Sequence, residues 1–346
     1  MIRVAIADDS PFTCRLLQSY LEDGDCEIVG VAHDAAATRD LVRRERPDVL
    51  TLDLEMPGGH GLDLLNQVVT ETAVPVVVIS GVTRRAASTT LRALELGAVD
   101  FVLKFTPGAP VSPAILRREI VAKVKTAAAA NISLASCPAV PGMDADALVP
   151  APRHPDARPA ADVIVIGAST GGPQAVRELV SQFPADFSTP CVIVQHLPAS
   201  FAGAFAAQIA RAARVPVDVA EDTDRLTPGH LLVTPGGRHL LLRPDRRVEL
   251  KPVADGDLHR PSIDATMISA ADAFAATAVG VVLTGMGTDG AEGLRRIRSS
   301  GGAGYVQDPA SCVVGSMPAR AFERAGADYI GAPAAIGAML ARRRIA

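Results

Sequence analysis

Residues 163–176 read VIVIGASTGGPQAV: an apolar run, a glycine-rich turn around Ser169 and the start of an amphipathic segment. A fully apolar run of this length predicts a strand buried on both faces, and Pro173 suits the first turn of a helix. The turn has the pattern G-x-S-x-G, whose small residues permit a tight bend that holds a serine hydroxyl clear of the sheet. The stretch therefore predicts a strand–turn–helix unit of an α/β domain.

The same turn has a second interpretation. A glycine-rich turn that follows a first strand can also hold a phosphate group on its backbone amides. The spacing is not G-x-G-x-x-G, and no lysine stands where a P-loop requires one. The pentapeptide alone leaves a nucleophilic serine and a phosphate loop both open.

The sequence on either side of this stretch continues the alternation of apolar runs and amphipathic segments. Further strands are expected at 191–195, 217–220, 231–234, 279–284 and 303–307, with the first at 163–167. Helices are expected at 173–182, 201–213, 263–276, 291–299 and 317–325. Two short runs, 240–243 and 248–251, flank a Pro-Asp turn and predict a hairpin insertion. The C-terminal part is therefore predicted to be a mainly parallel, doubly wound α/β domain.

The N-terminal part follows the same rule. Apolar strands are expected at 2–7, 28–32, 49–52, 76–80 and 99–103, with helices between them and a last helix near 112–125. Between the two parts, residues 126–161 are rich in alanine and proline, a composition typical of an extended linker. We expect domains at 1–125 and 162–346, joined by a linker at 126–161.

Composition excludes several classes of protein. The 346 residues carry 34 Lys and Arg against 38 Asp and Glu, so the net charge of −4 gives no basic footprint for nucleic acid. No apolar run approaches the roughly 18 residues of a membrane span, and no membrane insertion is expected. The five cysteines form no CxxC pair, which favours reduced thiols in a cytoplasmic protein.

Five polar residues stand at strand ends of the N-terminal domain. Asp8 and Asp9 follow the first strand, Asp53 the third, Ser80 the fourth and Lys104 the fifth. Because the carboxyl ends of parallel strands meet at one edge, these side chains should converge. Clustered carboxylates suit Mg²⁺, which would neutralise charge during phosphoryl transfer to a carboxylate, while the lysine would pair with the phosphate.

These residues resemble the receiver domain of two-component response regulators, a flavodoxin-like fold. The resemblance rests on IADDS at 6–10, LDLEMPGGHGLD at 52–63, VISG at 78–81 and LRALELGAVDFVLK at 91–104. It implies that Asp53 accepts phosphate from a histidine kinase, that Asp8 and Asp9 join it in the Mg²⁺ site, and that Ser80, Phe101 and Lys104 form the switch. Two positions depart from the family: Phe105 replaces the usual proline after the lysine, and His60 replaces an acid.

A nucleophilic serine needs a base and an orienting acid. Of seven histidines, His196 directly follows an apolar strand, within QHLP. Asp289 lies in a glycine-rich loop after another apolar run, although alone it would suit a helix N-cap. The chain order Ser169, His196, Asp289 differs from that of ordinary α/β-hydrolases, but triads are defined by geometry.

The C-terminal motifs resemble the Rossmann-like catalytic domain of the chemotaxis protein-glutamate methylesterase (CheB) family. They are GASTGG at 167–172, QHLP at 195–198, TPGGRHLLLR at 234–243, HRPSID at 259–264, LTGMGTDGA at 283–291 and QDPASCVVGSMP at 307–318. The resemblance implies Ser169 as nucleophile, His196 as base and Asp289 as orienting acid, with Thr170 and Met286 beside them and no cofactor. It further implies glutamate γ-methyl ester hydrolysis and glutamine deamidation on methyl-accepting chemoreceptors, inhibited by an unphosphorylated receiver that covers the active site.

Two rival functions remain at this point. A response regulator with a non-catalytic, protein- or DNA-binding output domain would leave the three triad positions replaceable. A nucleotide-binding enzyme would use GASTGG as its phosphate loop and would be stabilised by nucleotide.

Overall fold

The computed structural model describes residues 1–57, 61–104, 113–130, 161–254, 257 and 259–342. Within these ranges the chain forms two compact units, the first from the residues up to 130 and the second from the residues after 160. No helix in the described ranges is both long and apolar enough to cross a membrane. Phe105, His60 and most of the expected linker lie outside the described residues.

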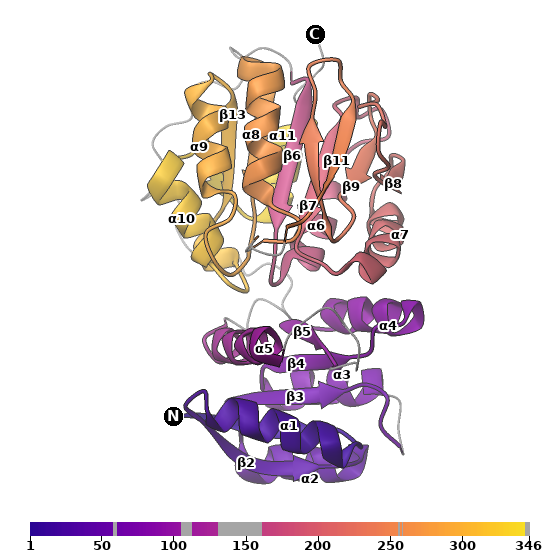
Figure 1. The fold of residues 1–346 in the computed structure, drawn as a ribbon, viewed down its shortest axis with the longest axis vertical. Coiled ribbons are helices and arrows are strands. Elements are labelled where there is room, and N and C mark those ends of the chain that lie inside the picture. Colours follow the sequence, from indigo (N-terminus) through magenta and orange to yellow (C-terminus); the bar gives the residue numbers. More distant parts are fainter. Residues whose placement is uncertain (58–60, 105–112, 131–160, 255–256, 258, 343–346) are drawn as a thin grey trace. The chain divides into compact units, whose positions relative to one another are not determined.

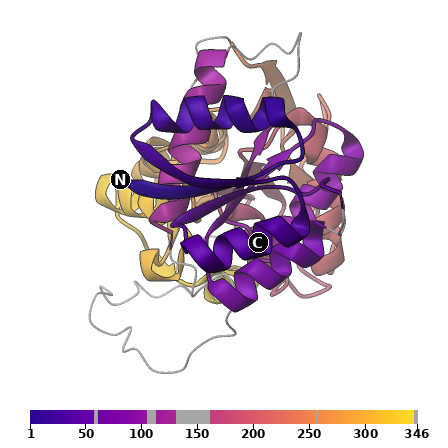
Figure 2. The same cartoon turned by 90° about the horizontal axis from the view of Figure 1, so that it is seen from below.

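The first unit is a five-stranded parallel sheet in the order β2-β1-β3-β4-β5. The strands are β1 Ile2–Ala7, β2 Cys26–Ala32, β3 Val49–Asp53, β4 Val76–Ser80 and β5 Asp100–Leu103. The helices are α1 Pro11–Glu22, α2 Ala35–Glu45, α3 Gly61–Thr72, α4 Arg84–Glu95 and α5 Pro113–Ala128. Helices cover both faces of the sheet (Figures 1 and 2), so β3 and β4 are buried throughout. The predicted doubly wound fold is confirmed.

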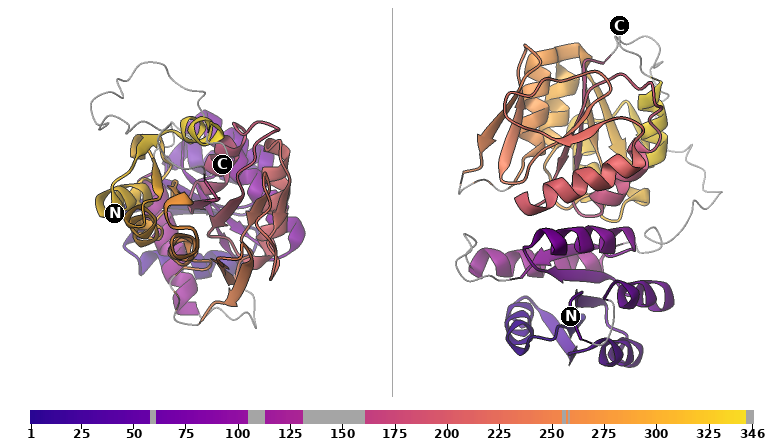
Figure 3. Two further views of the ribbon diagram at one scale, coloured as in Figure 1. Left: turned by 90° about the horizontal axis from the view of Figure 1, so that it is seen from above. Right: turned by 90° about the vertical axis from the view of Figure 1, so that its right-hand side faces the viewer.

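The second unit is built on a seven-stranded parallel sheet in the order β14-β13-β12-β6-β7-β9-β8. Its strands are β6 Val163–Ala168, β7 Cys191–Gln195, β8 Val217–Val219, β9 Leu231–Val233, β12 Ala278–Val282, β13 Ala303–Gln307 and β14 Tyr329–Gly331. Its α-helices are α6 Gly172–Val180, α7 Ala202–Ala212, α8 Ile263–Phe274, α9 Ala291–Ser299, α10 Ser316–Ala325 and α11 Pro333–Ala341. Two further views show the helices on both sides of this sheet (Figure 3).

The predicted hairpin is also present. Strands β10 Arg238–Leu242 and β11 Val248–Pro252 pair antiparallel and form a sheet of their own. Strand β14 and helix α11 were not predicted, because a three-residue strand has no measurable alternation and the helix sequence PAAIGAMLA is nearly uniformly small or apolar. Helix α5 continues to Ala128, three residues into the alanine-rich start of the expected linker.

Strand order in the second unit locates its functional edge. Strand β7, which follows β6 in the chain, pairs with one edge of β6. Strand β12, which comes later, pairs with the other edge of β6. The order of strands therefore reverses at β6, and in open α/β sheets such a switch point opens a crevice at the carboxyl ends of the strands. The predicted nucleophile, base and acid follow these three strands.

Candidate active site and acidic pocket

The turn that carries Ser169 is fixed by its two flanking glycines and by backbone hydrogen bonds. A Cβ on Gly167 would lie 2.3 Å from the Cγ2 atom of Ile263, so α8 packs directly against this backbone. Gly171 has a φ of +74°, a conformation that disfavours other residues. The Ser169 amide donates to the Thr284 carbonyl at 3.0 Å, and the Ser169 carbonyl accepts from the Gly172 amide at 2.7 Å. The turn thus holds its serine in one place.

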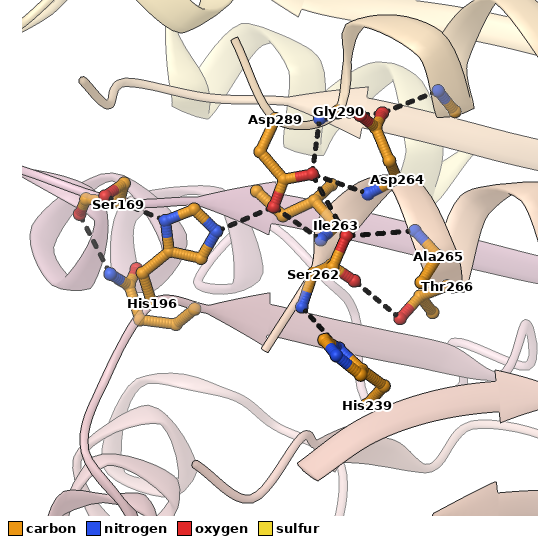
Figure 4. A network of polar contacts seen from close by, with 12 residues as sticks. Ser169, His196, His239, Ser262, Ile263, Asp264, Ala265, Thr266, Asp289 and Gly290 are labelled. Carbon is orange, nitrogen blue, oxygen red and sulfur yellow. Dashed lines mark hydrogen bonds and ion pairs between the residues drawn. The ribbon is translucent and has the colours of Figure 1, made fainter. Parts of the chain in front are cut away.

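His196 joins the serine to the acid. Its Nδ1 atom lies 3.2 Å from Ser169 Oγ, and its Nε2 atom lies 2.8 Å from Asp289 Oδ2 (Figure 4). A carboxylate accepts a hydrogen and cannot donate one, so it favours the tautomer with a proton on Nε2. Nδ1 is then the unprotonated nitrogen that faces the serine hydroxyl. The geometry is that of a nucleophile, a base and an orienting acid.

Asp289 is almost fully buried yet well supplied with donors. Besides His196, its two oxygens accept from the backbone amides of Ile263 at 2.7 Å and Asp264 at 2.9 Å, and from the Ser262 hydroxyl at 3.3 Å. Burial opposes its charge, but the hydrogen bonds from His196 and from these amides hold the pKa of Asp289 below its ordinary value. Asp289 therefore stays ionised and can stabilise an imidazolium.

Two further histidines lie at this site, although the sequence pattern placed them by loops. The His259 ring is stacked on that of His196, with centroids 5.2 Å apart and planes 10° apart. His239 Nδ1 accepts from the Ser262 amide at 3.1 Å, at the start of α8 (Figure 4). The position of HRPSID directly before a predicted helix was the available signal. Ligand atoms of His196, His259 and Asp289 lie within 4.8 Å of one another, but both Asp289 oxygens already accept hydrogen bonds and we assign no metal there.

Thr170 follows Ser169 directly, and Met286 belongs to the loop after β12. The Thr170 side chain is buried and its carbonyl accepts from Thr284 Oγ1 at 2.9 Å. Met286 follows Gly285, at which an added Cβ would lie 2.8 Å from the Cβ of Ser169. The loop after β12 therefore runs against the nucleophile.

The acidic residues of the first unit converge as predicted. Asp8, Asp9 and Asp53 bring carboxylate oxygens within 4.8 Å of one another. Lys104 Nζ lies 2.7 Å from Asp53 Oδ2 and 3.0 Å from Asp8 Oδ2. Burial raises the pKa of Asp8, and the Ser10 amide and Lys104 oppose that effect. Oxygen ligands with excess negative charge fit a magnesium ion.

The two remaining residues of the predicted switch contact the neighbouring helices α4 and α5. Ser80 Oγ lies 2.5 Å from Thr90 Oγ1 on α4 and 3.2 Å from the Gly81 carbonyl. Phe101 is buried, and the Lys123 ammonium of α5 lies 5.0 Å from its ring centroid. Both residues are thus held by helices that flank the pocket.

Two family models match this chain, one in each unit. The family model described as CheB methylesterase matches residues 164–340, and the model described as response regulator receiver domain matches residues 4–111. The chain belongs to the CheB methylesterase family. Both matched ranges lie within the two domains expected from the sequence.

Individual relatives extend over nearly the whole chain. The "Protein-glutamate methylesterase/protein-glutamine glutaminase 1" of Caulobacter vibrioides is 42% identical over 327 residues, 93% of this chain and 92% of that protein. The protein of the same name from Albidiferax ferrireducens is 39% identical over 339 residues, 95% of this chain and 90% of that protein. Among solved structures, the Thermotoga maritima CheB methylesterase catalytic domain is 32% identical with a TM-score of 0.50, covering 53% of this chain and 98% of that one.

Proposed function

We propose that the second unit hydrolyses γ-methyl esters of glutamate on chemoreceptors and releases methanol. The observation that carries this proposal is the continuous chain of contacts from Ser169 Oγ through the His196 ring to Asp289. The names of the relatives supply the substrate class. The same relatives support a second reaction, deamidation of receptor glutamines through the same acyl intermediate.

The reaction proceeds in two halves. Ser169 Oγ attacks the ester carbonyl while His196 Nδ1 takes the serine proton, and this proton leaves with the methoxy oxygen as methanol. Asp289 stabilises the imidazolium that forms. In the second half a water attacks the acyl-enzyme and gives a proton to His196, which passes a proton to Ser169 Oγ as the acyl bond breaks and the glutamate side chain of the receptor is released. With glutamine as substrate, ammonia replaces methanol as the leaving group.

The first unit regulates this activity through Asp53. In our proposal an Asp53 carboxylate oxygen attacks the phosphorus of a phosphohistidine on a chemotaxis-type histidine kinase, and the histidine leaves. Mg²⁺ held by Asp8, Asp9 and Asp53 would neutralise the charge of the transferring group. Lys104, which pairs with Asp53 at 2.7 Å, is positioned to pair with the phosphate. The resulting aspartyl phosphate raises the rate of ester hydrolysis.

We place this activity in the cytoplasm. The four described cysteines, Cys14, Cys26, Cys191 and Cys312, are all free and buried, as a reducing compartment favours. The two rival functions are less well supported. A phosphate loop has no need of an imidazole 3.2 Å from its hydroxyl or of a buried acid behind that imidazole, and a non-catalytic output domain has no need of either.

Methanol release from methylated receptor tests the proposal. Wild type and Ser181→Ala, a control at a surface hydroxyl that bonds the Glu178 carbonyl, should release methanol at the same rate. Ser169→Ala should lose about three or more orders of magnitude, as triad serines do. Methanol release by Ser169→Ala at the wild-type rate would exclude the hydrolase mechanism.

A further inference from the structure

Helices α8 and α9 begin side by side, and each supplies the acceptor for the other's first amides. Asp289, just before α9, accepts from the amides of Ile263 and Asp264, the first two residues of α8. In return, Oδ1 of Asp264 accepts from the Gly290 amide at 2.9 Å and the Gly293 amide at 2.6 Å, at the start of α9. Figure 4 shows the Asp289 carboxylate against the backbone of Ile263 and Asp264, and the Asp264 carboxylate against the backbone of Gly290. The exchange satisfies amides that have no partner inside their own helices.

The two helix ends are in direct contact at this exchange. A Cβ on Gly293 would lie 2.5 Å from the Cβ of Met267 and 3.1 Å from the Cα of Asp264, so α9 packs on α8 without an intervening side chain. The loop that presents Asp289 to His196 is therefore attached to α8 at two successive residues. Asp289 accepts hydrogen bonds from α8 amides, and the Gly290 amide donates to Asp264 of α8.

Asp264 also places a second negative charge behind the triad. Burial raises the pKa of Asp264 to about 6, helped by the nearby charges of Asp289 and Glu292 and opposed by the Gly293 and Gly290 amides. Glu292, the other acid facing it, lies on α9 and is paired with Arg295 and Arg324. Near and above neutral pH Asp264 and Asp289 are therefore both ionised, and Asp289 is the one of the two that hydrogen-bonds to His196.

We propose that Asp264 is a positioning residue of the hydrolase, whose ionised carboxylate ties the Asp289 loop to α8 and strengthens His196 as a base. The proposal rests on the proposed function, because it concerns the same triad. Negative charge near an imidazole favours its protonated form, so the second carboxylate makes His196 a better acceptor of the Ser169 proton. The ionised carboxylate of Asp264 lowers the free energy of unfolding, because burial disfavours its charge in the folded state.

Two substitutions separate the charge from the geometry. Asp264→Asn keeps the Oδ1 acceptor for Gly290 and Gly293 but removes the charge, whereas Asp264→Ala removes both. Asp272→Asn, a more exposed acid of the same helix paired with Arg296, is the matched control. The full chain is assayed for methanol release from methylated receptor at a saturating small-molecule acyl phosphate, with kcat, KM and the pH profile of kcat/KM recorded.

For Asp264→Asn we expect kcat to fall about tenfold with KM unchanged, because a small displacement or weakening of the catalytic base slows the chemical step without changing substrate binding. The acid limb of its pH profile should move to lower pH, because the imidazolium of His196 loses a neighbouring negative charge. Hydrogen-exchange protection of the β6 and β12 amides at pH 8 should be equal to or above wild type, since a disfavoured charge is gone. Asp264→Ala should lose more activity than Asp264→Asn, and Asp272→Asn should match wild type.

An Asp264→Asn protein with the wild-type acid limb and kcat would overturn the proposal. So would a loss of kcat accompanied by an equal loss of exchange protection, because a purely structural role predicts that both fall together. The proposed function fails separately, through methanol release by Ser169→Ala. If Ser169→Ala is inactive and Asp264→Asn has the wild-type profile, only the role of Asp264 is wrong.

Discussion

The hydroxyl oxygens of Ser80 and Thr90 lie 2.5 Å apart, where the end of β4 meets the middle of α4. Both side chains are buried. We propose that Ser80 responds to phosphate on Asp53, as its resemblance to receiver switch residues implies. On that proposal the Thr90 hydroxyl competes with the phosphate for Ser80 and links α4 to the phosphorylation state of the pocket.

Replacing Thr90 should favour phosphorylation. In Thr90→Val the Ser80 hydroxyl retains the Gly81 carbonyl but loses its partner on α4. Because a hydrogen bond contributes about 1 kcal/mol net, the equilibrium should shift roughly fivefold toward the phosphorylated form. Intact-mass spectrometry at fixed acyl phosphate concentration measures the phosphorylated fraction. Thr89→Val, which alters a hydroxyl bonded to the Arg85 carbonyl, is the control. A fraction equal to or below wild type in Thr90→Val would exclude this role.

Removal of divalent metal should separate the two activities. Chelation by EDTA should abolish phosphorylation of Asp53, because the carboxylates of Asp8, Asp9 and Asp53 repel an incoming phosphate without a cation. Basal methanol release should be unaffected, since the proposed mechanism uses Ser169, His196 and Asp289 and no metal. Phosphorylation of Asp53 at the normal rate in EDTA would contradict the magnesium assignment.

Phosphorylation itself should depend on one carboxylate. Asp53→Asn should show no stimulation of methanol release by acyl phosphate, while Asp63→Asn, an exposed acid of the first turn of α3, should be stimulated like wild type. An Asp53→Asn protein that is stimulated as strongly as wild type would remove the proposed switch.

The glycine after the nucleophile turn should be irreplaceable. In Gly171→Ala the new Cβ would lie 2.8 Å from the Cβ of Val313 at a φ of +74°. Strain at such positions costs about 1–3 kcal/mol. Hydrogen exchange of the β6 amides measures the loss. Gly203→Ala, in α7 with no atom within 4 Å of the new Cβ, should instead stabilise by about 0.5–1 kcal/mol. Equal exchange rates in Gly171→Ala and wild type would show that the turn relaxes without cost.

The stacked histidine predicts a pH dependence of stability. Burial lowers the pKa of His259 from the ordinary 6.5. The charge of Asp289 opposes this effect, and the charge of His196 adds to it. An unfolded chain binds a proton at this position more readily than the folded one. The stability contributed by neutral His259 is therefore fully present above about pH 6.5 and is lost as the pH falls from there through the lower pKa of the folded state. Exchange protection of the β12 amides should therefore decrease between pH 7 and pH 5 less in His259→Phe than in wild type. An equal decrease would contradict this.

Much of the site could be predicted because its parts are local. Ser169, His196 and Asp289 each follow an apolar run, and parallel strands bring such ends together. The fold could be predicted for the same reason. Continuous apolar strands such as β6 and β7 bury both of their faces, which indicates a parallel sheet covered by helices on both sides. The acids at Asp8, Asp9 and Asp53 follow the same logic.

What could not be predicted depends on contacts between distant segments. Nothing in the local pattern places the ring of His259 on that of His196, or shows that Asp264 and Asp289 exchange caps between α8 and α9. Which nitrogen of His196 faces the serine depends on how β7 and the loop after β12 are spaced. The Ser80–Thr90 contact likewise requires the packing of α4 on β4, which sequence periodicity indicates only as a buried face.

The central claim is that Ser169, His196 and Asp289 act as one unit, and a mutant cycle tests it most directly. Ser169→Ala, His196→Ala and the double variant are compared for kcat of methanol release at saturating methylated receptor. Residues of one triad are non-additive, so each single variant should lose about as much activity as the double variant. Two results would contradict this. One is a double variant whose fold-loss in kcat equals the product of the fold-losses of the two single variants, and the other is a single variant with wild-type kcat.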